Sequence, residues 1–360
     1  MYNDSSLRDF ARDVFTAMGC DGAQARIAAE ILVDADLKGI DSHGIARLKG
    51  YVRLWEDNRI NTQPNICITH ETPSTAVVDG DEGLGLVVAP EAMKIAIEKA
   101  SQVGSGWVSV RNSNHYGIAG YHAMMALEHD MVGISMTNAS PLVAPTFSSE
   151  RLLGTNPIAV AIPAHKQPPF VADLATTTVA NGKLEVMKRK GKTIPEGWAQ
   201  DAWGQPSTEA TIVEQGGALL PLGGSRNLGS HKGYCLGSIV DIFSAVFSGA
   251  NYGPWVPPFV SFLDPASDPV GKGIGHFLGA FRIDAFRPTD EFKTHMDLWI
   301  QRFRNSKPAK GQEKVLIPGD PEREMKEKRQ TDGIPLLEAV VKDLGELAVK
   351  FKVEPPRPIG

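Results

Sequence analysis

The 360-residue chain has few of the features that mark disulfide-rich, metal-binding or membrane proteins. Its three cysteines, Cys20, Cys67 and Cys235, lie far apart and form no CxxC pair, which argues against a disulfide framework and a zinc site. We therefore expect no bound metal and a reducing compartment, the cytoplasm. No apolar run reaches the roughly 18 residues of a membrane span, and the first residues lack the pattern of a signal peptide.

The chain also has no excess of basic residues. Its 37 Lys and Arg face 42 Asp and Glu, which gives a formal net charge of −5. A protein that binds nucleic acid or an anionic membrane usually carries a basic surface. We therefore expect neither as a partner and interpret the chain as a globular enzyme or binding protein.

Familiar nucleotide and hydrolase motifs are missing as well. "GLGLVV" lacks the third glycine of GxGxxG, and "GKGIGHFLGA" follows a proline-rich loop at the wrong spacing. "KGKT" lacks the earlier glycine of a phosphate loop, and GxSxG, HExxH and CxxC do not occur. The motifs alone therefore predict no Rossmann fold, serine hydrolase or zinc enzyme.

The apolar periodicity predicts helices at both ends of the chain and strands between them. Three helices are expected from residue 5 to about 58. β-Rich runs such as "TAVVDG", "GWVSVRN", "MVGISMTN" and "NPIAVAIPA" occupy the middle, and "HKGYCLGSIVDIFSAVFSGA" reads as a helix buried on most sides. Apolar positions from Thr289 onwards predict two further helices, so we expect the two ends to pack together.

The stretch "DSHGIARLKGY" combines three chemically useful side chains. Asp41 and Ser42 read as a helix N-cap, and helical spacing then places His43, Arg47 and Tyr51 on one face. Arginine matches a carboxylate with a planar fork, and histidine exchanges protons near neutral pH. A solvated helix face is the structural alternative, although such faces usually alternate charges of both signs.

Two further regions carry candidate chemistry. In "VRNSNHYGIAGYHA", His115 falls on a loop between a strand and a helix, where it suits proton transfer or merely bonds the backbone. In "ADLATTTVANGK", a strand ends at Asp173 and a threonine-rich helix start could bind phosphate or simply cap the helix. Lys232, between glycines at the start of a helix, could meet a phosphate or ribose or solvate the helix end.

Together these stretches resemble the malate/L-lactate dehydrogenase family, whose motifs they match in order over almost the whole chain. The matching stretches are "DSHGIARLKGY", "NSNHYGIAGYHA", "GTNPIAVAIP", "DLATTTVANGKL", "IPEGWAQD", "LGGSRNLGSHKGYCLGSIVDIFSAVFSGA" and "IPGDPE". That family also includes sulfolactate and ureidoglycolate dehydrogenases, diketogulonate reductase and cyclic-imine carboxylate reductases. It differs from the Rossmann-type lactate and malate dehydrogenases, which agrees with the missing GxGxxG.

The resemblance implies roles for individual residues. His115 and His43 match the family's catalytic histidines, with His115 the first choice for the proton donor. Ser42, Arg47, Tyr51 and Asp201 match substrate-side positions. The positions that match cofactor contacts are Ser140, Asp173, Leu174, Ala175, Thr176, Thr177, His231, Lys232, Gly319 and Asp320.

The resemblance also implies a fold and an assembly. We expect an α+β chain with a non-Rossmann cofactor domain, a largely antiparallel or mixed sheet, and a helical domain formed by both termini. The expected division is a helical domain of 1–60 plus 285–350, a substrate-side α/β region of 61–125 plus 270–284, and a cofactor-binding domain of 126–269. The family forms dimers, so a homodimer is expected.

The implied activity is hydride transfer between NAD or NADP and C2 of a small 2-hydroxy or 2-oxo acid of the malate or lactate type. Arg47 would hold the substrate carboxylate while a histidine exchanges the proton. A reductase of a cyclic imine 2-carboxylate and a non-redox binding protein of the same fold stay open as alternatives. The residues alone leave the choice between NAD and NADP open.

Overall fold

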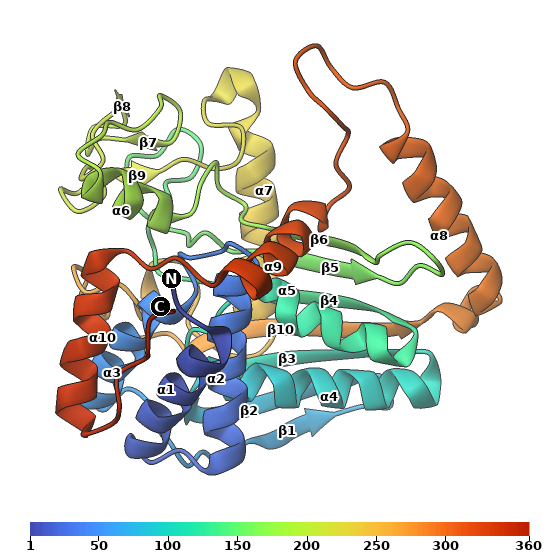
Figure 1. Cartoon of the computed structure of the whole chain (residues 1–360), viewed down its shortest axis with the longest axis horizontal. Coiled ribbons are helices and arrows are strands. Elements are labelled where there is room, and N and C mark those ends of the chain that lie inside the picture. The colour runs from blue at the N-terminus through green and yellow to red at the C-terminus, as the bar shows by residue number, and fades with distance from the viewer. Residues whose placement is uncertain (360) are drawn as a thin grey trace.

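The computed structural model describes residues 1–359 and is built around one seven-stranded mixed sheet (Figure 1). Neighbouring strands are antiparallel except β2 and β3, which are parallel. This arrangement confirms the expected mixed, largely antiparallel sheet. In spatial order the strands are β1 (Cys67–Glu71), β2 (Thr75–Gly83), β3 (Ser105–Ser113), β10 (Ile274–Arg282), β4 (Met131–Thr137), β5 (Ile158–Ile162) and β6 (Phe170–Leu174).

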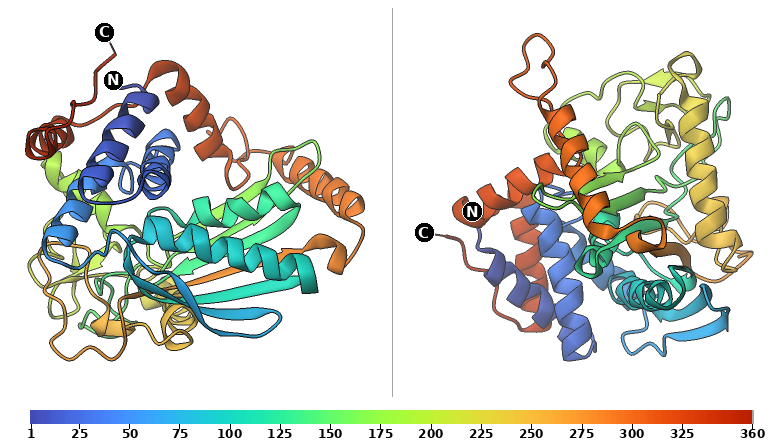
Figure 2. Two further views of the ribbon diagram at one scale, coloured as in Figure 1. Left: turned by 90° about the horizontal axis from the view of Figure 1, so that it is seen from below. Right: turned by 90° about the vertical axis from the view of Figure 1, so that its right-hand side faces the viewer.

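Helices cover the sheet on both faces (Figures 1 and 2). One face carries α4 (Gly85–Val103), which connects the parallel strands β2 and β3, and the short α5 (Ala119–Met124). Helix α4 approaches the sheet closely because its inner face is rich in alanine, and a Cβ on Gly106 of β3 would lie 2.0 Å from the Ala96 carbonyl oxygen. The opposite face carries α7 (Ser230–Asp241), which continues as a π-helical turn over Ile242–Val246.

The two ends of the chain form a helical block beside the sheet, as the sequence predicts (Figure 2). Its apolar cluster joins residues from the N-terminal helices, such as Phe10 and Leu32, to Leu344 and Leu347 near the C-terminus. The backbone of Tyr2 also bonds that of Ile334. The helices of the block are α1 (Asp4–Ala17), α2 (Gly22–Leu37), α3 (Leu48–Glu56), α9 (Asp320–Asp332) and α10 (Glu338–Phe351).

Helix α8 (Thr289–Arg304) departs from the expected arrangement, because it lies away from the other terminal helices (Figure 1). Its Asp297 carboxylate accepts three backbone N–H groups of residues 165–167, in the connection between β5 and β6. Ile300 is buried, but Trp299 is 40% exposed, so the apolar stripe of this helix does not face a core. The expected domain division stays a prediction, and its boundary at 125–126 falls between strands of the same sheet.

A small unit with its own apolar cluster lies at the upper left of Figure 1, above the helical block. Leu184 of α6 (Asn181–Arg189) is buried in this cluster with Leu142 and Ile194. Its three-stranded sheet has the order β8 (Pro206–Ser207), β7 (Ala199–Gln200) and β9 (Ala218–Leu219). Short 3₁₀ turns elsewhere cover Ile45–Arg47, Met125–His129, Arg226–Leu228, Gly253–Trp255 and Ile283–Ala285.

The sequence prediction that the helix from His231 is buried on most sides is wrong for the single chain. Gly237 and Val240 face the protein, but Ile239, Ile242 and Phe247 are exposed, the last by 59%. The sheet can cover only one side of this helix, and no other element of the described residues covers the opposite side. Within residues 1–359, no helix is long and apolar enough to cross a bilayer.

Candidate active site

The segment that carries His43 is a loop stabilised by a buried carboxylate, and the predicted N-cap at Asp41 and Ser42 is wrong. Regular helix begins only at Leu48, after the 3₁₀ turn. Asp36 of α2 accepts the Ile45 N–H at 2.6 Å, and a Cβ on Gly44 would lie 1.9 Å from its Oδ1. Only glycine therefore fits between His43 and the 3₁₀ turn.

The C-terminal part of the chain holds the same loop from the other side. Arg329 of α9 donates to the backbone oxygen of Asp36 and to the carboxylate of Asp41. Burial raises the pKa of Asp36 to about 8, and the nearby charge of Asp41 adds to this effect against the opposing bond from Ile45. The geometry of the loop thus depends on residues nearly 300 positions apart.

The other histidine, His115, follows the end of β3. Its neighbour Asn114 is buried and donates to the backbone oxygens of Arg59, Glu82 and Gly83. On the other side Tyr116 is buried, with its hydroxyl bonded to Ser135 at 3.1 Å. Two anchored neighbours therefore fix the His115 backbone.

The two histidines lie together. The rings of His43 and His115 stack with their centroids 5.6 Å apart and their planes 20° apart. In each ring Nδ1 already has a protein partner, since the Ser42 Oγ lies 2.9 Å from His43 Nδ1 and the Tyr51 hydroxyl lies 2.6 Å from His115 Nδ1. Nε2 is therefore the nitrogen that each ring can offer to a substrate.

Tyr51 has a different position from the one predicted. The helical pattern placed it on a shared face with His43, but His43 lies outside the helix and Tyr51 is fully buried. The Tyr51 ring packs edge-on against Phe15 and Phe259. Its hydroxyl bonds His115, so it acts as a positioning residue behind the histidine.

Removing the Tyr51 hydroxyl should disturb His115 and leave the fold intact. We expect Tyr51→Phe to lower kcat roughly 10- to 100-fold with little change in KM, because the phenyl ring keeps its packing while His115 Nδ1 loses its 2.6 Å hydroxyl partner and keeps only the weaker 3.4 Å bond from the Gly117 N–H. Steady-state kinetics and thermal unfolding check this, with Tyr2→Phe as the control. A kcat equal to that of the wild type would contradict the positioning role.

Both histidines are held in the neutral form. Desolvation lowers the pKa of His43 to about 4, and the charge of Arg47 lowers it further. Desolvation also lowers the pKa of His115 well below its usual value, together with the charges of His43, Arg47 and His276. Near neutral pH the site therefore presents two uncharged imidazoles beside one guanidinium.

Arg47 provides that positive charge. Its side chain is 20% exposed, its Nε donates to the backbone oxygen of Ser42, and its Nη2 lies 3.3 Å from Oε2 of Glu185. The contact with Ser42 holds the guanidinium beside the loop of His43. Its remaining N–H groups can bind a carboxylate with charge-assisted hydrogen bonds.

Sequence reasoning did not identify Phe259 as a residue of the site. It lies on the long loop between α7 and β10, and its ring centroid is 4.6 Å from that of His115. Ser140, which the resemblance assigned to the cofactor, accepts the Phe259 N–H at 2.8 Å. The loop is rich in Pro and Gly, but no local signal distinguishes Phe259 from its other aromatic residues.

The segment from Asp173 to Thr177 includes the last two residues of β6 and the loop after it, and it does not begin a helix as predicted. Helix α6 starts only at Asn181, and the threonine hydroxyls bond inside the protein, Thr176 to the oxygens of Thr155 and Asn156 and Thr177 to that of Val179. Leu174 is exposed, and Ala175 is half-buried.

The carboxylate of Asp173 lies beside the start of α5. It accepts the Gly120 N–H at 2.7 Å, and a Cβ on Gly120 would lie 2.8 Å from it. Desolvation raises the pKa of Asp173 to about 6, against the opposing effect of the Gly120 bond. Asp173 thus connects the end of β6 to the helix that follows His115.

The start of α7 gathers positive charge. His231 and Lys232 lie in its first turn, beside Arg226 in the preceding 3₁₀ turn. Desolvation and the two neighbouring cations lower the pKa of His231. Its Nδ1 is buried without a hydrogen-bond partner among the described residues. The backbone N–H groups of Ser230 and Lys232 already bond the oxygens of Ser225 and Gly229, so a phosphate group here would meet mainly the side chains and the helix dipole.

An adjoining cavity of about 400 Å³ extends this cationic region. It is lined by Arg226 and several hydroxyl side chains, including those of Thr146, Ser225 and Ser230, and by no acidic residue. The exposed aromatic rings of Phe147 and Trp203 line it too. An orphaned buried nitrogen beside a polar cavity fits a phosphate-bearing cofactor.

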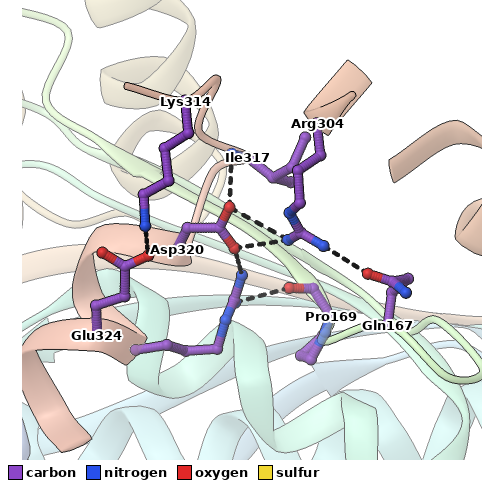
Figure 3. A network of polar contacts seen from close by, with 8 residues as sticks. Gln167, Pro169, Arg304, Lys314, Ile317, Asp320 and Glu324 are labelled. Carbon is purple, nitrogen blue, oxygen red and sulfur yellow. Dashed lines mark hydrogen bonds and ion pairs between the residues drawn. The ribbon is translucent and has the colours of Figure 1, made fainter. Parts of the chain in front are cut away.

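Asp320 has its carboxylate fully occupied by the protein (Figure 3). It accepts from the Ile317 N–H, from Arg304 at 2.9 Å and from Arg323. Burial alone would raise the pKa of Asp320, but these bonds outweigh it and lower that pKa. Gly319 precedes it with a φ of +95°, and Pro318 bonds Val171, so this turn lies beside β6.

Asp201, assigned to the substrate side, lies in the small unit. Its Oδ1 accepts the N–H groups of Trp203 and Gln205, both at 2.9 Å, which closes a tight turn. The contacts of Asp201 connect it neither to the histidines nor to Arg47. In residues 1–359, no group of three His, Cys, Asp or Glu side chains is placed to hold a metal.

The structure thus brings together His43, His115, Arg47, Ser42 and Tyr51, with neutral imidazoles beside a carboxylate-binding cation. The model of the malate/L-lactate dehydrogenase family matches residues 2–345. The chain belongs to this family. It is therefore a dehydrogenase.

Relatives in the family match nearly the whole chain. A malate dehydrogenase of Pyrococcus horikoshii is 46% identical over 349 residues, which is 97% of this chain and 94% of the relative. An L-sulfolactate dehydrogenase of Methanocaldococcus jannaschii is 40% identical over 93% of this chain and 92% of the relative.

Solved structures of family members have the same fold. The malate dehydrogenase of Pyrococcus horikoshii superimposes with a TM-score of 0.89 at 41% identity, covering 98% of this chain and 96% of that one. The malate dehydrogenase of Entamoeba histolytica superimposes with a TM-score of 0.92 at 35% identity, covering 99% of both chains. These agreements extend to both termini, so the helical block is part of the shared fold.

Proposed function

We propose that this dehydrogenase interconverts a 2-oxo acid and the corresponding 2-hydroxy acid with a nicotinamide cofactor. The observation that carries the proposal is the stacked pair His43 and His115, each with Nε2 available, beside the guanidinium of Arg47. A 2-oxo acid needs a cation for its carboxylate and a proton for its carbonyl oxygen.

In this mechanism Arg47 binds the substrate carboxylate and thereby orients C2. In oxidation the neutral His115 accepts the hydroxyl proton at Nε2. In reduction the imidazolium form of His115 returns that proton to the oxygen of C2 as negative charge develops there, with Tyr51 holding Nδ1 in both directions. His43 lies beside it, with Nδ1 held by Ser42. A bound nicotinamide supplies the hydride.

We place the cofactor along the edge formed by the end of β6 and the start of α7. Asp173, Leu174 and Ala175 would border its nicotinamide half. His231 and Lys232 would meet a phosphate, and the buried Nδ1 of His231 supports that role. The hydroxyls of Thr176 and Thr177, the Oγ of Ser140, and the Gly319–Asp320 turn would shape this edge through their contacts with the protein.

We further propose that the cofactor is NADP. An acidic residue usually binds the free ribose diol of NAD, whereas an arginine accommodates the 2′-phosphate of NADP. The 400 Å³ cavity beside α7 is lined by Arg226 and by serine and threonine hydroxyls without an acid. That lining favours a 2′-phosphate over a diol.

For the substrate we propose oxaloacetate and malate. The support is the malate dehydrogenase of Pyrococcus horikoshii, which is 46% identical over most of both chains. We also propose a homodimer, because the exposed apolar face of α7 and its π-helical turn would otherwise face water. The three free cysteines support a cytoplasmic location.

The lowered histidine pKa values predict that kcat/KM for malate oxidation falls only at a lower pH than an ordinary histidine would give. A neutral imidazole must accept the hydroxyl proton during malate oxidation, so activity is present above the histidine pKa and lost as the pH falls through it. Because the pKa of His43 is about 4 and that of His115 is lowered below 6.5, kcat/KM should stay level at pH 6. A decline centred at pH 6.5 would contradict this, once recovery at neutral pH shows that the enzyme stayed folded.

The proposed reaction is tested by near-ultraviolet absorbance, which follows oxidation of NADPH and NADH separately. The assay offers the 2-oxo acids oxaloacetate, pyruvate and sulfopyruvate, with a cyclic imine 2-carboxylate as the alternative substrate. We expect the fastest oxidation with NADPH and oxaloacetate. Turnover of the imine alone would contradict the proposed 2-oxo acid substrate, and faster turnover with NADH would contradict the proposed use of NADP.

A further inference from the structure

Glu185 of α6 already occupies part of the proposed carboxylate clamp. Its Oε2 lies 3.3 Å from Nη2 of Arg47, and its Oε1 accepts from the side chain of Asn181 at 3.1 Å. Both charged side chains are mostly buried, with exposed fractions of 20% for Arg47 and 29% for Glu185. The contact therefore lies inside the site rather than on the open surface.

The shape of a guanidinium makes this contact competitive. Arginine can bind a carboxylate at two points through Nε and Nη2, or through Nη1 and Nη2. In Arg47 the Nε already donates to the backbone oxygen of Ser42. Both two-point edges include Nη2, which is the atom that faces Glu185, so a substrate carboxylate on either edge shares this nitrogen with Glu185 and is opposed by its negative charge.

The two partners belong to different packing units. Glu185 follows Leu184, which is buried in the cluster of the small unit, whereas Arg47 precedes α3 in the helical block. Between these units, α6 also presses against the loop of His43, because a Cβ on Gly182 would lie 2.5 Å from the Cβ of Ser42. The pair therefore connects two units that share no apolar cluster.

Two cavities border this connection. One, of about 240 Å³, is lined by Ser42, Arg47, Glu185 and residues before α10. The other, of about 610 Å³, is lined by Arg47, Glu185 and Phe259 among others. With open space on both sides, Glu185 can leave Arg47 without displacing a packed core.

We propose that Glu185 is an internal counter-ion that holds Arg47 in the empty enzyme and competes with the carboxylate of the substrate for it. This inference rests on the proposed function, because it takes Arg47 as the substrate clamp. Glu185 sets substrate affinity through Arg47 and does not touch the reacting atoms, so it is a positioning residue. Its charge makes every carboxylate ligand compete for the clamp.

The test is Glu185→Gln, which keeps the size and the bond to Asn181 and removes the charge. Because the pair meets through one 3.3 Å contact and both side chains keep some exposure to water, its contribution is small, and we expect KM for the 2-oxo acid to fall about two- to fivefold, with kcat changed less than about twofold. Glu185→Ala is the second variant and should shift KM in the same direction. An unchanged or higher KM in Glu185→Gln would overturn the proposal.

The matched control is Glu214→Gln. Glu214 pairs with Lys188 of α6 at 2.7 Å and lines the same 610 Å³ cavity, but it makes no contact with Arg47. Removing its charge should leave KM unchanged. An equal fall in KM in this control would show a general charge effect and contradict a specific role for Glu185.

A binding measurement separates this inference from the proposed reaction. Oxalate carries the same carboxylate and is not reduced, so calorimetry of its binding needs no turnover. We expect Glu185→Gln to bind oxalate about two- to fivefold more tightly than the wild type, and the gain to vanish when Arg47→Ala is added. Absent turnover with every 2-oxo acid would overturn the proposed function alone, whereas an unchanged oxalate affinity would overturn the role of Glu185.

Discussion

Replacing His115 by glutamine is expected to lower kcat for 2-oxo acid reduction by about 10²–10⁴-fold, which is the usual contribution of a positioned acid or base. Glutamine can still hydrogen-bond the carbonyl oxygen, so KM should change little. It cannot release a proton near neutral pH, so the developing alkoxide stays unprotonated. Pre-steady-state and steady-state assays of the purified variant measure both constants.

The matched control for this variant is His129→Gln. His129 is an exposed histidine at the end of the 3₁₀ turn Met125–His129, away from the stacked pair. Its replacement should leave kcat and KM unchanged. If His115→Gln retained more than about a tenth of the wild-type kcat while His43→Gln lost most of it, the proton donor would be His43.

The second large effect is expected for Arg47→Ala. The variant loses two charge-assisted hydrogen bonds to the substrate carboxylate, and kcat/KM for 2-oxo acids should fall about 10²–10³-fold. Arg47→Lys should recover only part of this loss, because an ammonium group is a point charge without the planar fork. The fold should persist, since Arg47 is not part of an apolar cluster.

Lys49→Ala is the control for the loss of positive charge near the site. Lys49 lies two residues further along, is exposed, and pairs with Asp343 and Glu346 of α10. Its replacement should leave kcat/KM within about twofold of the wild type. Near-normal turnover by Arg47→Ala, with normal thermal unfolding in both variants, would show that Arg47 does not bind the substrate carboxylate.

The helices and strands of the layers can be predicted from local sequence patterns where each element has one apolar face packed against the core. Helices α1 and α2 and the strands β2 to β6 were predicted correctly, since a buried face imposes a period of 3.6 or 2 on the apolar residues, although the second half of α2 is buried on all sides. The helix of α3 was predicted too, but it begins at Leu48 and not at Asp41. Helix α8 shows the limit of that reasoning. Its stripe, which includes Trp299 and Phe303, is equally periodic but lies mostly exposed in the single chain.

The chemistry of the site could be predicted from residue types, but its geometry could not. His43, Arg47 and Tyr51 were placed on one helical face, whereas a loop, a 3₁₀ turn and a buried helix position carry them. The difference arises from Asp36 and Arg329, which hold that loop through long-range contacts. Spacing along the chain contains no information on such contacts.

The sequence also did not predict the residues that other units of the fold contribute to the site. Phe259 lies against His115 only because its loop bonds Ser140, and Glu185 meets Arg47 only because α6 belongs to the small unit. Asp320 is the opposite case, a residue predicted for the cofactor site whose carboxylate binds other side chains of the protein. The resemblance assigned it to the cofactor, and its carboxylate bonds Arg304 and Arg323 within the protein (Figure 3).

The central claim is that hydride reaches C2 of a 2-oxo acid held between Arg47 and His115. The direct measurement uses NADPH deuterated at nicotinamide C4, on the face that transfers hydride, and determines by mass spectrometry and proton NMR where the label appears after oxaloacetate reduction. This account predicts one deuterium at C2 of malate. Malate without deuterium at C2, formed by a fully labelled and active cofactor, would contradict it.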